Sequence, residues 1–319
     1  MSQAMLLRYD PRLIEEAVFL ALRERPETRE FQEQRERVYE VADPQERERF
    51  FGELHRSWFA RLGLGKVVEQ TLHERPQISS SIASCFVGCV AQAKEERAEL
   101  FVTPDEQLEG TTHRVVSILL RPESLLQEES LLTFLRHELF HVADMLDPTF
   151  AYEPTLPKAE GGPTHDSLII NRYRVLWDVT INGRMVRRGW ISDCVRDQQL
   201  AEFLQAFPML EGKGEQLFTL FFDGEQHPHP ELAAFAFDPR ASVGTLHGAS
   251  TPGTHCPLCR FPTHVFELQP DDLGQDVLAT IRQDFPQWTP SQGLCAQCAD
   301  LYRANQLSLG AAKQLPGWQ

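Results

Sequence analysis

Two histidines and a glutamate occur at a spacing that can hold and use a metal ion. They form the run His137-Glu138-Leu139-Phe140-His141. In a helix, residues four apart lie one turn apart on one face, so both imidazoles can reach a single ion. Zinc accepts neutral imidazole nitrogen, often keeps one position for water, and lowers the pKa of that water. Glu138, beside the first ligand, can then take the proton as general base.

Four cysteines near the end of the chain predict a second metal site. They form two pairs, Cys256-Pro-Leu-Cys259 and Cys295-Ala-Gln-Cys298, separated by the helix-like stretch QDVLATIRQDF. Four thiolates close a tetrahedral zinc site that needs no water and that folds a small module. Two matched pairs favour zinc over a redox dithiol. We therefore expect two Zn2+ ions, one catalytic and one structural.

The first motif requires a helix, which we predict over residues 128–146. Its apolar stripe includes Leu135, Leu139 and Val142, and the two motif histidines lie on the other side. A helix that is apolar on several sides is buried, so its polar residues need partners. Two segments rich in β-branched residues, AELFVT and HRVVSILLRP, precede it and predict strands. A second long helix is predicted from about residue 164 to Arg188, just before Gly189.

HELFH on a buried helix behind HRVVSILLRP resembles the zincin metallopeptidases. The resemblance covers residues 95–190. It implies that His137 and His141 bind zinc, that Glu138 is the general base, and that a strand borders the substrate cleft. The chain also resembles the SprT-like zincins, which often carry a C-terminal zinc ribbon. That arrangement implies His165, at the start of the second helix, as the third zinc ligand.

Three alternatives for the third ligand remain open after His165. Asp178 lies on a polar face of the second helix and resembles the gluzincin arrangement, with aspartate in place of glutamate. An Arg174–Asp178 ion pair one turn apart is the structural alternative. Asp147, in HVADMLDP, follows His141 at a spacing that resembles that of metzincins using aspartate, and Asp144, which stands where those proteins have a turn glycine, is the other candidate there. Each of these side chains has suitable ligand chemistry.

Other polar and thiol side chains are given structural roles. Tyr152, Tyr173 and Arg174 could polarise a substrate carbonyl, but nothing in the sequence fixes their geometry. Cys85 and Cys89 lie at helical spacing in an apolar segment, and we expect them to pack as small hydrophobic side chains. Cys194 has no assigned role.

Composition narrows the class of protein. The chain has 319 residues and a formal net charge of −15, from 31 basic and 46 acidic residues. This charge disfavours a nucleic-acid binder, although a local basic patch could still exist, for example around Arg184, Arg187 and Arg188. The sequence predicts no secretory signal and no membrane-spanning run, so we expect a cytoplasmic protein with no membrane partner.

These patterns predict an α+β fold with four parts. We expect a mainly helical N-terminal region at 1–78, broken into separate helices at Pro44. A zincin-like catalytic domain at 79–246 follows, then a four-cysteine zinc-ribbon-like module at 247–304 and a tail at 305–319.

The predicted function is that of a zinc-dependent hydrolase, a metallopeptidase-like enzyme acting on a peptide or protein substrate. The alternative is a non-catalytic zinc-containing scaffold or interaction protein that acts through its C-terminal zinc module. A third hypothesis, a nucleic-acid-associated protease, follows from the SprT-like arrangement, and the net charge argues against it.

Overall fold

The structure is a computed structural model with an α+β arrangement in which helices predominate. It describes residues 5–23, 25–104, 112–158, 163–210, 212–225, 227–240, 256–260, 266–267, 273–295 and 297–303. The segment 247–255 before the cysteine pairs and the tail 305–319 lie outside these residues. The α+β prediction is confirmed. Within the described part, no helix has both the length and the apolar character needed to cross a membrane.

Contacts divide the chain into two compact units, which we describe separately. The first unit comprises Met1–Pro154 and Ile181–Val195, and the second comprises Thr155–Thr180 and Arg196–Gln319. The predicted boundary at residue 78 therefore falls inside the first unit. Because the division passes through one continuous helix, α7 (Pro163–Arg187), residues of that helix belong to both units.

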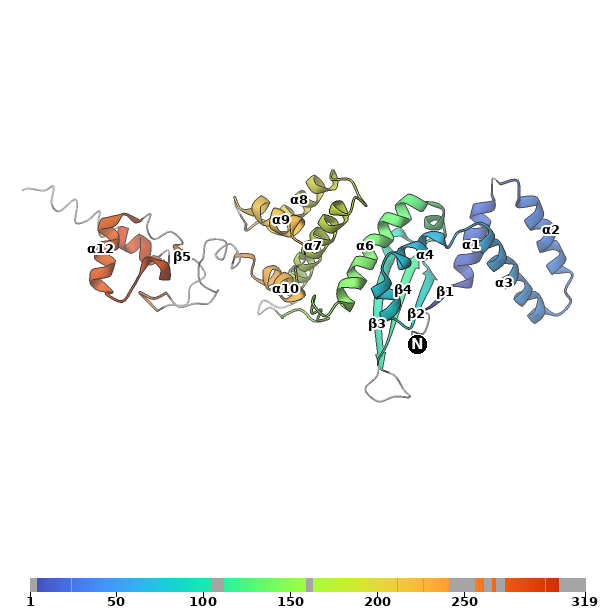
Figure 1. Cartoon of the computed structure of the whole chain (residues 1–319), viewed down its shortest axis with the longest axis horizontal. Helices are drawn as coiled ribbons and strands as arrows, with labels where there is room; N and C mark the ends of the chain where they lie inside the picture. The colour runs from blue at the N-terminus through green and yellow to red at the C-terminus, as the bar shows by residue number, and fades with distance from the viewer. Residues whose placement is uncertain are drawn as a thin grey trace, which may run out of the picture. The chain divides into compact units, whose positions relative to one another are not determined.

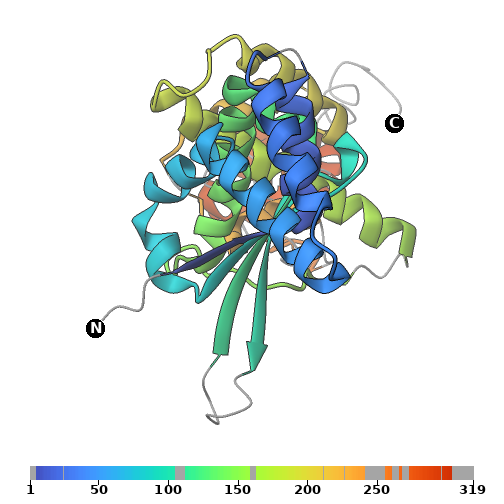
Figure 2. The same ribbon diagram turned by 90° about the vertical axis from the view of Figure 1, so that its right-hand side faces the viewer.

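The first unit contains a four-stranded sheet, whose strands extend below the helices in Figure 2. Its strand order is β1 (Leu6–Tyr9), β2 (Ser84–Cys89), β4 (Thr112–Leu120) and β3 (Arg97–Pro104). The first three strands run parallel, and β3 pairs antiparallel with β4 at the edge. Alternate residues of β4, among them Val116 and Ile118, are fully buried, as expected where one face of a strand packs on a core. Both predicted strands are confirmed.

Helices of the first unit share one hydrophobic core with this sheet. Asp43 accepts a hydrogen bond from the Gln45 N–H at 3.1 Å, and Pro44 occupies the first helical position, so α3 begins where the sequence predicts a break. Two short 3-10 turns, η1 (Ala93–Glu95) and η2 (Pro122–Leu126), connect other elements. The helices are α1 (Pro11–Leu22), α2 (Thr28–Tyr39), α3 (Pro44–Arg61), α4 (Lys66–His73), α5 (Pro76–Ser81) and α6 (Glu128–Leu146).

The N-terminal region also contains a strand where the sequence predicts only helices. Leu6 pairs with Ser84, so β1 extends the sheet at the edge opposite to β3. Cys85 and Cys89 likewise lie on strand β2 and not on a helix. Cys85 is fully buried, as predicted, whereas Cys89 is half-buried. A side-chain period of two, which places both thiols on one face, also accounts for their spacing.

The two long helices that carry the candidate ligands match the prediction closely. Helix α6 has the predicted bounds, and its Leu135, Leu139 and Val142 are fully buried in the core beside the sheet (Figure 1). Gly189 lies two residues after the last residue of α7, Arg187, and its φ of +67° is a left-handed conformation that glycine adopts without strain. The N–H of Trp190 donates to the Met185 carbonyl at 3.0 Å, which is the Schellman pattern of a helix C-terminus.

The second unit contains a helical part and a small module that carries the four cysteines. Packed phenylalanine rings hold its helices α8 (Val195–Ala206), α9 (Gly214–Asp223) and α10 (His229–Phe237), with Phe203 and Phe235 among them. In the module, β5 (Phe266–Glu267) pairs antiparallel with β6 (Leu294–Cys295). Helix α12 (Gln275–Asp284) confirms the predicted helix between the cysteine pairs. The module has a small core, in which buried cysteines pack with Leu278, Ile281 and Trp288. A 3-10 turn, η4 (Pro290–Gln292), precedes β6.

Candidate metal centres

The motif residues of α6 form one candidate metal centre with a residue of α7. The His137 and His141 rings lie one turn apart, with centroids 5.1 Å from each other and planes at 72°. Together with Asp178 they each offer a ligand atom, and these atoms all lie within 4.8 Å of one another. All three residues are half-buried. Two imidazole nitrogens and a carboxylate oxygen are a donor set that suits a divalent transition metal with an open position.

Asp178, and not His165, joins the two motif histidines. His165 lies in the first turn of α7 and is exposed. The two residues are thirteen positions apart, which separates them by about 20 Å along a straight helix. The structure therefore brings Asp178 together with the two histidines and leaves His165 far along the same helix. The expectation for His165 depends on the family resemblance, which does not show which end of α7 lies near α6.

Two other candidate ligands make their own contacts. The Asp144 carboxylate, 3% exposed, accepts hydrogen bonds of 2.7 and 2.6 Å from the Arg184 guanidinium. Asp147 is the C-cap of α6, and its Oδ1 accepts from the backbone N–H and the hydroxyl of Thr149 at 2.8 and 2.7 Å. Asp144 thus holds α7 against α6 through Arg184, and Asp147 caps the helix end.

Glu138 is positioned by the edge strand of the sheet. Its Oε2 accepts a hydrogen bond of 3.0 Å from the backbone N–H of Ala98 on β3, and its Oε1 lies 3.4 Å from Nδ1 of His137. Burial raises the pKa of Glu138, but the hydrogen bonds from His137 and Ala98 and the nearby imidazoles outweigh burial, so the pKa is lowered. The carboxylate form can therefore accept a proton at neutral pH. The sequence did not reveal the Ala98 contact, because a backbone N–H carries no residue-type signal.

The three residues considered for carbonyl polarisation have different surroundings. The hydroxyl of Tyr173 is buried and lies 2.7 Å from Nδ1 of His229, within the second unit. Arg174 is exposed, and Tyr152 is half-buried, with its pKa raised by burial. The contact of Tyr173 with His229 and the exposure of Arg174 favour a structural role for these two residues.

The four cysteines form a second candidate metal centre. Cys256, Cys259, Cys295 and Cys298 lie together as one group. The Sγ atoms of Cys256 and Cys298 are 3.9 Å apart, and those of Cys259 and Cys295 are 3.8 Å apart. A tetrahedral ion with metal–sulfur bonds of about 2.3 Å would separate neighbouring sulfurs by about 3.8 Å. A disulfide requires about 2.05 Å, so these separations fit a shared metal ion and not a disulfide.

Backbone N–H groups of the module point at the sulfurs. The Cys295 N–H donates to Sγ of Cys256 at 3.4 Å, and the Cys298 N–H donates to Sγ of Cys295 at 3.3 Å. Burial raises the pKa of Cys256, but hydrogen bonds from Cys259, Cys295 and Leu258 lower it to about 7. Donors of this kind stabilise thiolates, the form in which cysteine binds metal.

No protein-family model, no curated protein and no solved structure matches this chain. Its own residues therefore carry the functional interpretation: a histidine–histidine–aspartate group with a glutamate beside it, and a four-cysteine group, each able to hold a metal ion.

Proposed function

We propose that this protein is a zinc-dependent hydrolase, most closely a metallopeptidase. One observation supports this proposal above the others: Glu138 stands between two histidines whose ligand atoms lie within 4.8 Å of a third ligand, Asp178. Two histidines and one carboxylate are the ligand set of several catalytic zinc sites, which keep a fourth position open. Zinc bound there would polarise a substrate carbonyl and lower the pKa of a water molecule at that open position.

The chain's own residues supply the proton transfer. Glu138 accepts the proton from the attacking water and returns it to the leaving nitrogen, which makes it general base and then general acid. The hydrogen bond from the Ala98 N–H holds Oε2 of Glu138, with a nitrogen–oxygen distance of 3.0 Å. The other oxygen remains the better placed to exchange a proton, because it has only the longer contact of 3.4 Å with His137. Asp178 takes the place of His165 as the proposed third ligand.

The edge strand supports a peptide as the substrate. Ala98 belongs to β3, which pairs with β4 on one side only, and its N–H points outward to Glu138. Phe101 and Val102, farther along β3, are 48% and 55% exposed. An extended peptide can add to such an edge through main-chain hydrogen bonds, which would align its carbonyls along the strand that contacts the general base. A small ester or amide would gain nothing from this edge.

Zinc is also the proposed ion of the cysteine group. Sulfur–sulfur separations of 3.8 and 3.9 Å fit a zinc–thiolate tetrahedron, and the small core around Trp288 is typical of a module that an ion folds. Four protein ligands leave no position for water, so this ion would be structural. Two zinc ions per chain would separate the proposal from a non-catalytic scaffold that holds only the cysteine-bound ion.

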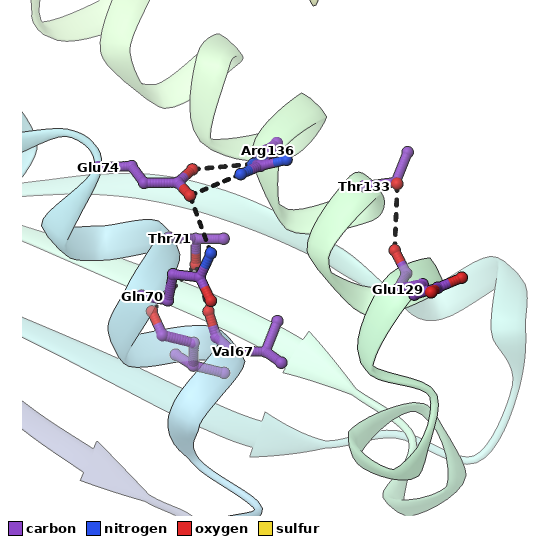
Figure 3. Close-up of polar contacts among 8 residues, drawn as sticks. Val67, Gln70, Thr71, Glu74, Glu129, Thr133 and Arg136 are labelled. Carbon is purple, nitrogen blue, oxygen red and sulfur yellow. Dashed lines mark hydrogen bonds and ion pairs between the residues drawn. The ribbon is translucent and has the colours of Figure 1, made fainter. Parts of the chain in front are cut away.

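Glu138→Gln tests the enzyme directly. Zinc content should stay unchanged, because Glu138 is not a ligand, while cleavage of dye-quenched unfolded protein and mixed peptides should fall by about 100-fold or more. Glu129→Gln, an exposed glutamate on the same helix (Figure 3), is the matched control and should cleave normally. Equal turnover of the Glu138→Gln and Glu129→Gln proteins would rule out the proposed mechanism.

A further inference from the structure

Four guanidinium groups surround two aromatic rings in the first unit. The rings of Phe140, on α6, and Trp190, just after α7, have centroids 5.8 Å apart. Cζ of Arg75 lies 3.6 Å from the Phe140 centroid, and Cζ of Arg188 lies 4.9 Å from it. Such distances place each cation on an aromatic face. We call Arg75, Arg136, Arg184 and Arg188 the arginine cluster.

Local structure explains why these residues meet. Gly189 turns the chain after α7, and the Trp190 N–H then donates a hydrogen bond to the Met185 carbonyl. The chain at Trp190 is therefore held close to the last turn of α7. Arg136 and Phe140 are four residues apart on α6 and share one face. Arg75 is the N-cap of α5. The sequence allows a basic patch around Arg184, Arg187 and Arg188, but it gives no sign that Arg75 lies beside them.

Two members of the cluster have carboxylate partners. Arg136 donates to Glu74 through Nε and Nη2, at 2.9 and 2.7 Å (Figure 3). Arg184 donates to Asp144 through Nη1 and Nη2, at 2.7 and 2.6 Å. Figure 3 also shows the amide of Gln70 on the Glu74 carboxylate, at 3.1 Å, so this acid is already shared. These two acids balance two of the four positive charges.

Arg75 and Arg188 have no acidic partner among the described residues. Arg75 is only 2% exposed, and its Nη2 is buried without a hydrogen-bond acceptor. Burial, and then the charges of Arg188 and Arg184, lower the pKa of Arg75 to about 10, although the charges of Asp144 and Glu74 oppose this in part. A buried cation that lacks an acceptor is costly, and an anion of opposite charge would remove that cost. Arg188 is exposed, so the cluster reaches from the interior to the surface.

We propose that Arg75 and Arg188 bind a phosphate dianion, either free phosphate or the phosphate of a monoester. Guanidinium groups present paired N–H donors that match the oxygens of a phosphate, and two uncompensated positive charges match its two negative charges. The net charge of the chain is −15, so a generally basic surface does not explain a pair of arginines that lacks ion-pair partners in the described part of the chain and lies beside the Phe140 and Trp190 rings. This anion site is separate from the proton transfer proposed for Glu138.

Calorimetric titration of the full zinc-loaded chain tests the proposal. Inorganic phosphate should bind in a buffer whose ionic strength is matched with chloride, and O-phosphoserine is the second probe. Tighter binding of O-phosphoserine would assign the site to a monoester, and tighter binding of phosphate would assign it to the free ion. Absence of binding by both probes would overturn the proposal.

Variants locate the bound anion. Arg188→Gln should weaken phosphate binding by about tenfold, the cost of one charge-assisted hydrogen bond. Arg49→Gln is the matched control, because Arg49 also lies over a phenylalanine, with Cζ 5.0 Å from the Phe50 centroid. Unlike Arg188, Arg49 has an acidic partner, since its Nε lies 3.7 Å from Oε1 of Glu53. The Arg49→Gln protein should bind phosphate as the wild type does. Equal binding by both variants would mean that the cluster is only structural.

Two further variants separate the anion site from a general charge effect and from the metal centre. Arg75→Lys keeps the positive charge and the buried stem but loses the planar fork, so it should fold and bind phosphate more weakly. Circular dichroism checks that it folds, and wild-type affinity in a folded Arg75→Lys protein would contradict the proposal. His137→Gln removes a proposed metal ligand and should leave phosphate binding intact. Loss of binding in that variant would move the anion to the metal centre and overturn the proposal.

Discussion

Arg184 and Asp144 form a two-bond ion pair at 2.7 and 2.6 Å that joins α7 to α6. Asp144 follows His141 by three residues on α6, and Arg184 follows Asp178 by six on α7. The pair therefore links the two helices about one turn beyond His141 on α6 and nearly two turns beyond Asp178 on α7. Its side chains are 15% and 5% exposed, so it is mostly removed from water.

Arg184→Met should destabilise the protein by about 3 kcal/mol, because it leaves Asp144 as a buried charge without its partner. Urea unfolding followed by circular dichroism measures the loss. The double variant Arg184→Met/Asp144→Leu removes both charges and should recover most of it. A double variant as unstable as the single one would show that the charge of Asp144 is not the cause.

Asp178→Asn should weaken zinc binding at the histidine centre by about 100-fold or more. Loss of a group that only orients a ligand commonly costs about 10–100-fold in metal affinity, and Asp178 is proposed as a ligand itself. Competition with a chromogenic chelator measures the affinity. His165→Gln is the matched comparison, and its zinc affinity should equal that of the wild type. The opposite ranking of the two variants would restore His165 as the third ligand.

The sequence predicted the α6 helix and both metal-binding patterns because each depends on residues close together in the chain. Leu135, Leu139 and Val142 define a buried face by their spacing, and a pair such as Cys256 and Cys259 defines its own chelate. The choice between His165 and Asp178 could not be made in this way. Both lie on one helix, and only tertiary packing decides which end of that helix approaches the histidines.

Other features lacked any local signal. Strand β1 has four residues, Leu6–Tyr9, too few for an alternating pattern to separate a strand from the start of a helix. The hydrogen bond from Ala98 to Glu138 uses a backbone N–H, which every non-proline residue has. Arg75 joins the arginine cluster across a long stretch of sequence, so its neighbours there could not be read from its surroundings in the chain.

Cys259→Ser should release the structural zinc ion and unfold the C-terminal module. Three thiolates and one hydroxyl hold zinc much less well than four thiolates, and the module has only a small core of its own. Zinc content should fall by one ion per chain, and the fluorescence of buried Trp288 should shift to the red. Cys194→Ser removes an exposed thiol outside the group, so its zinc content should not change. Equal zinc content in the two variants would exclude the cysteine site.

His55 should make the first unit less stable in mild acid. Its imidazole is 5% exposed, packs against Phe19 and Phe31 with ring centroids at 5.4 and 5.9 Å, and has a buried Nε2 without a partner. Burial lowers the pKa of His55; Arg35 lowers it further, and Glu15 and Glu48 only partly oppose this. The folded state therefore resists protonation, whereas the unfolded chain takes up a proton near its ordinary pKa of 6.5.

It follows that the stability contributed by neutral His55 is complete above pH 6.5 and is lost as the pH falls through 6.5 toward the lower pKa of the folded state. Urea unfolding at about pH 7.5 and about pH 5.5 measures this loss. In His55→Gln, whose side chain is neutral at both values, the difference between the two free energies of unfolding should shrink. His73→Gln, which changes an exposed histidine of α4, should leave the difference as it is in the wild type. If His55→Gln retains the full difference, burial of this imidazole is not its source.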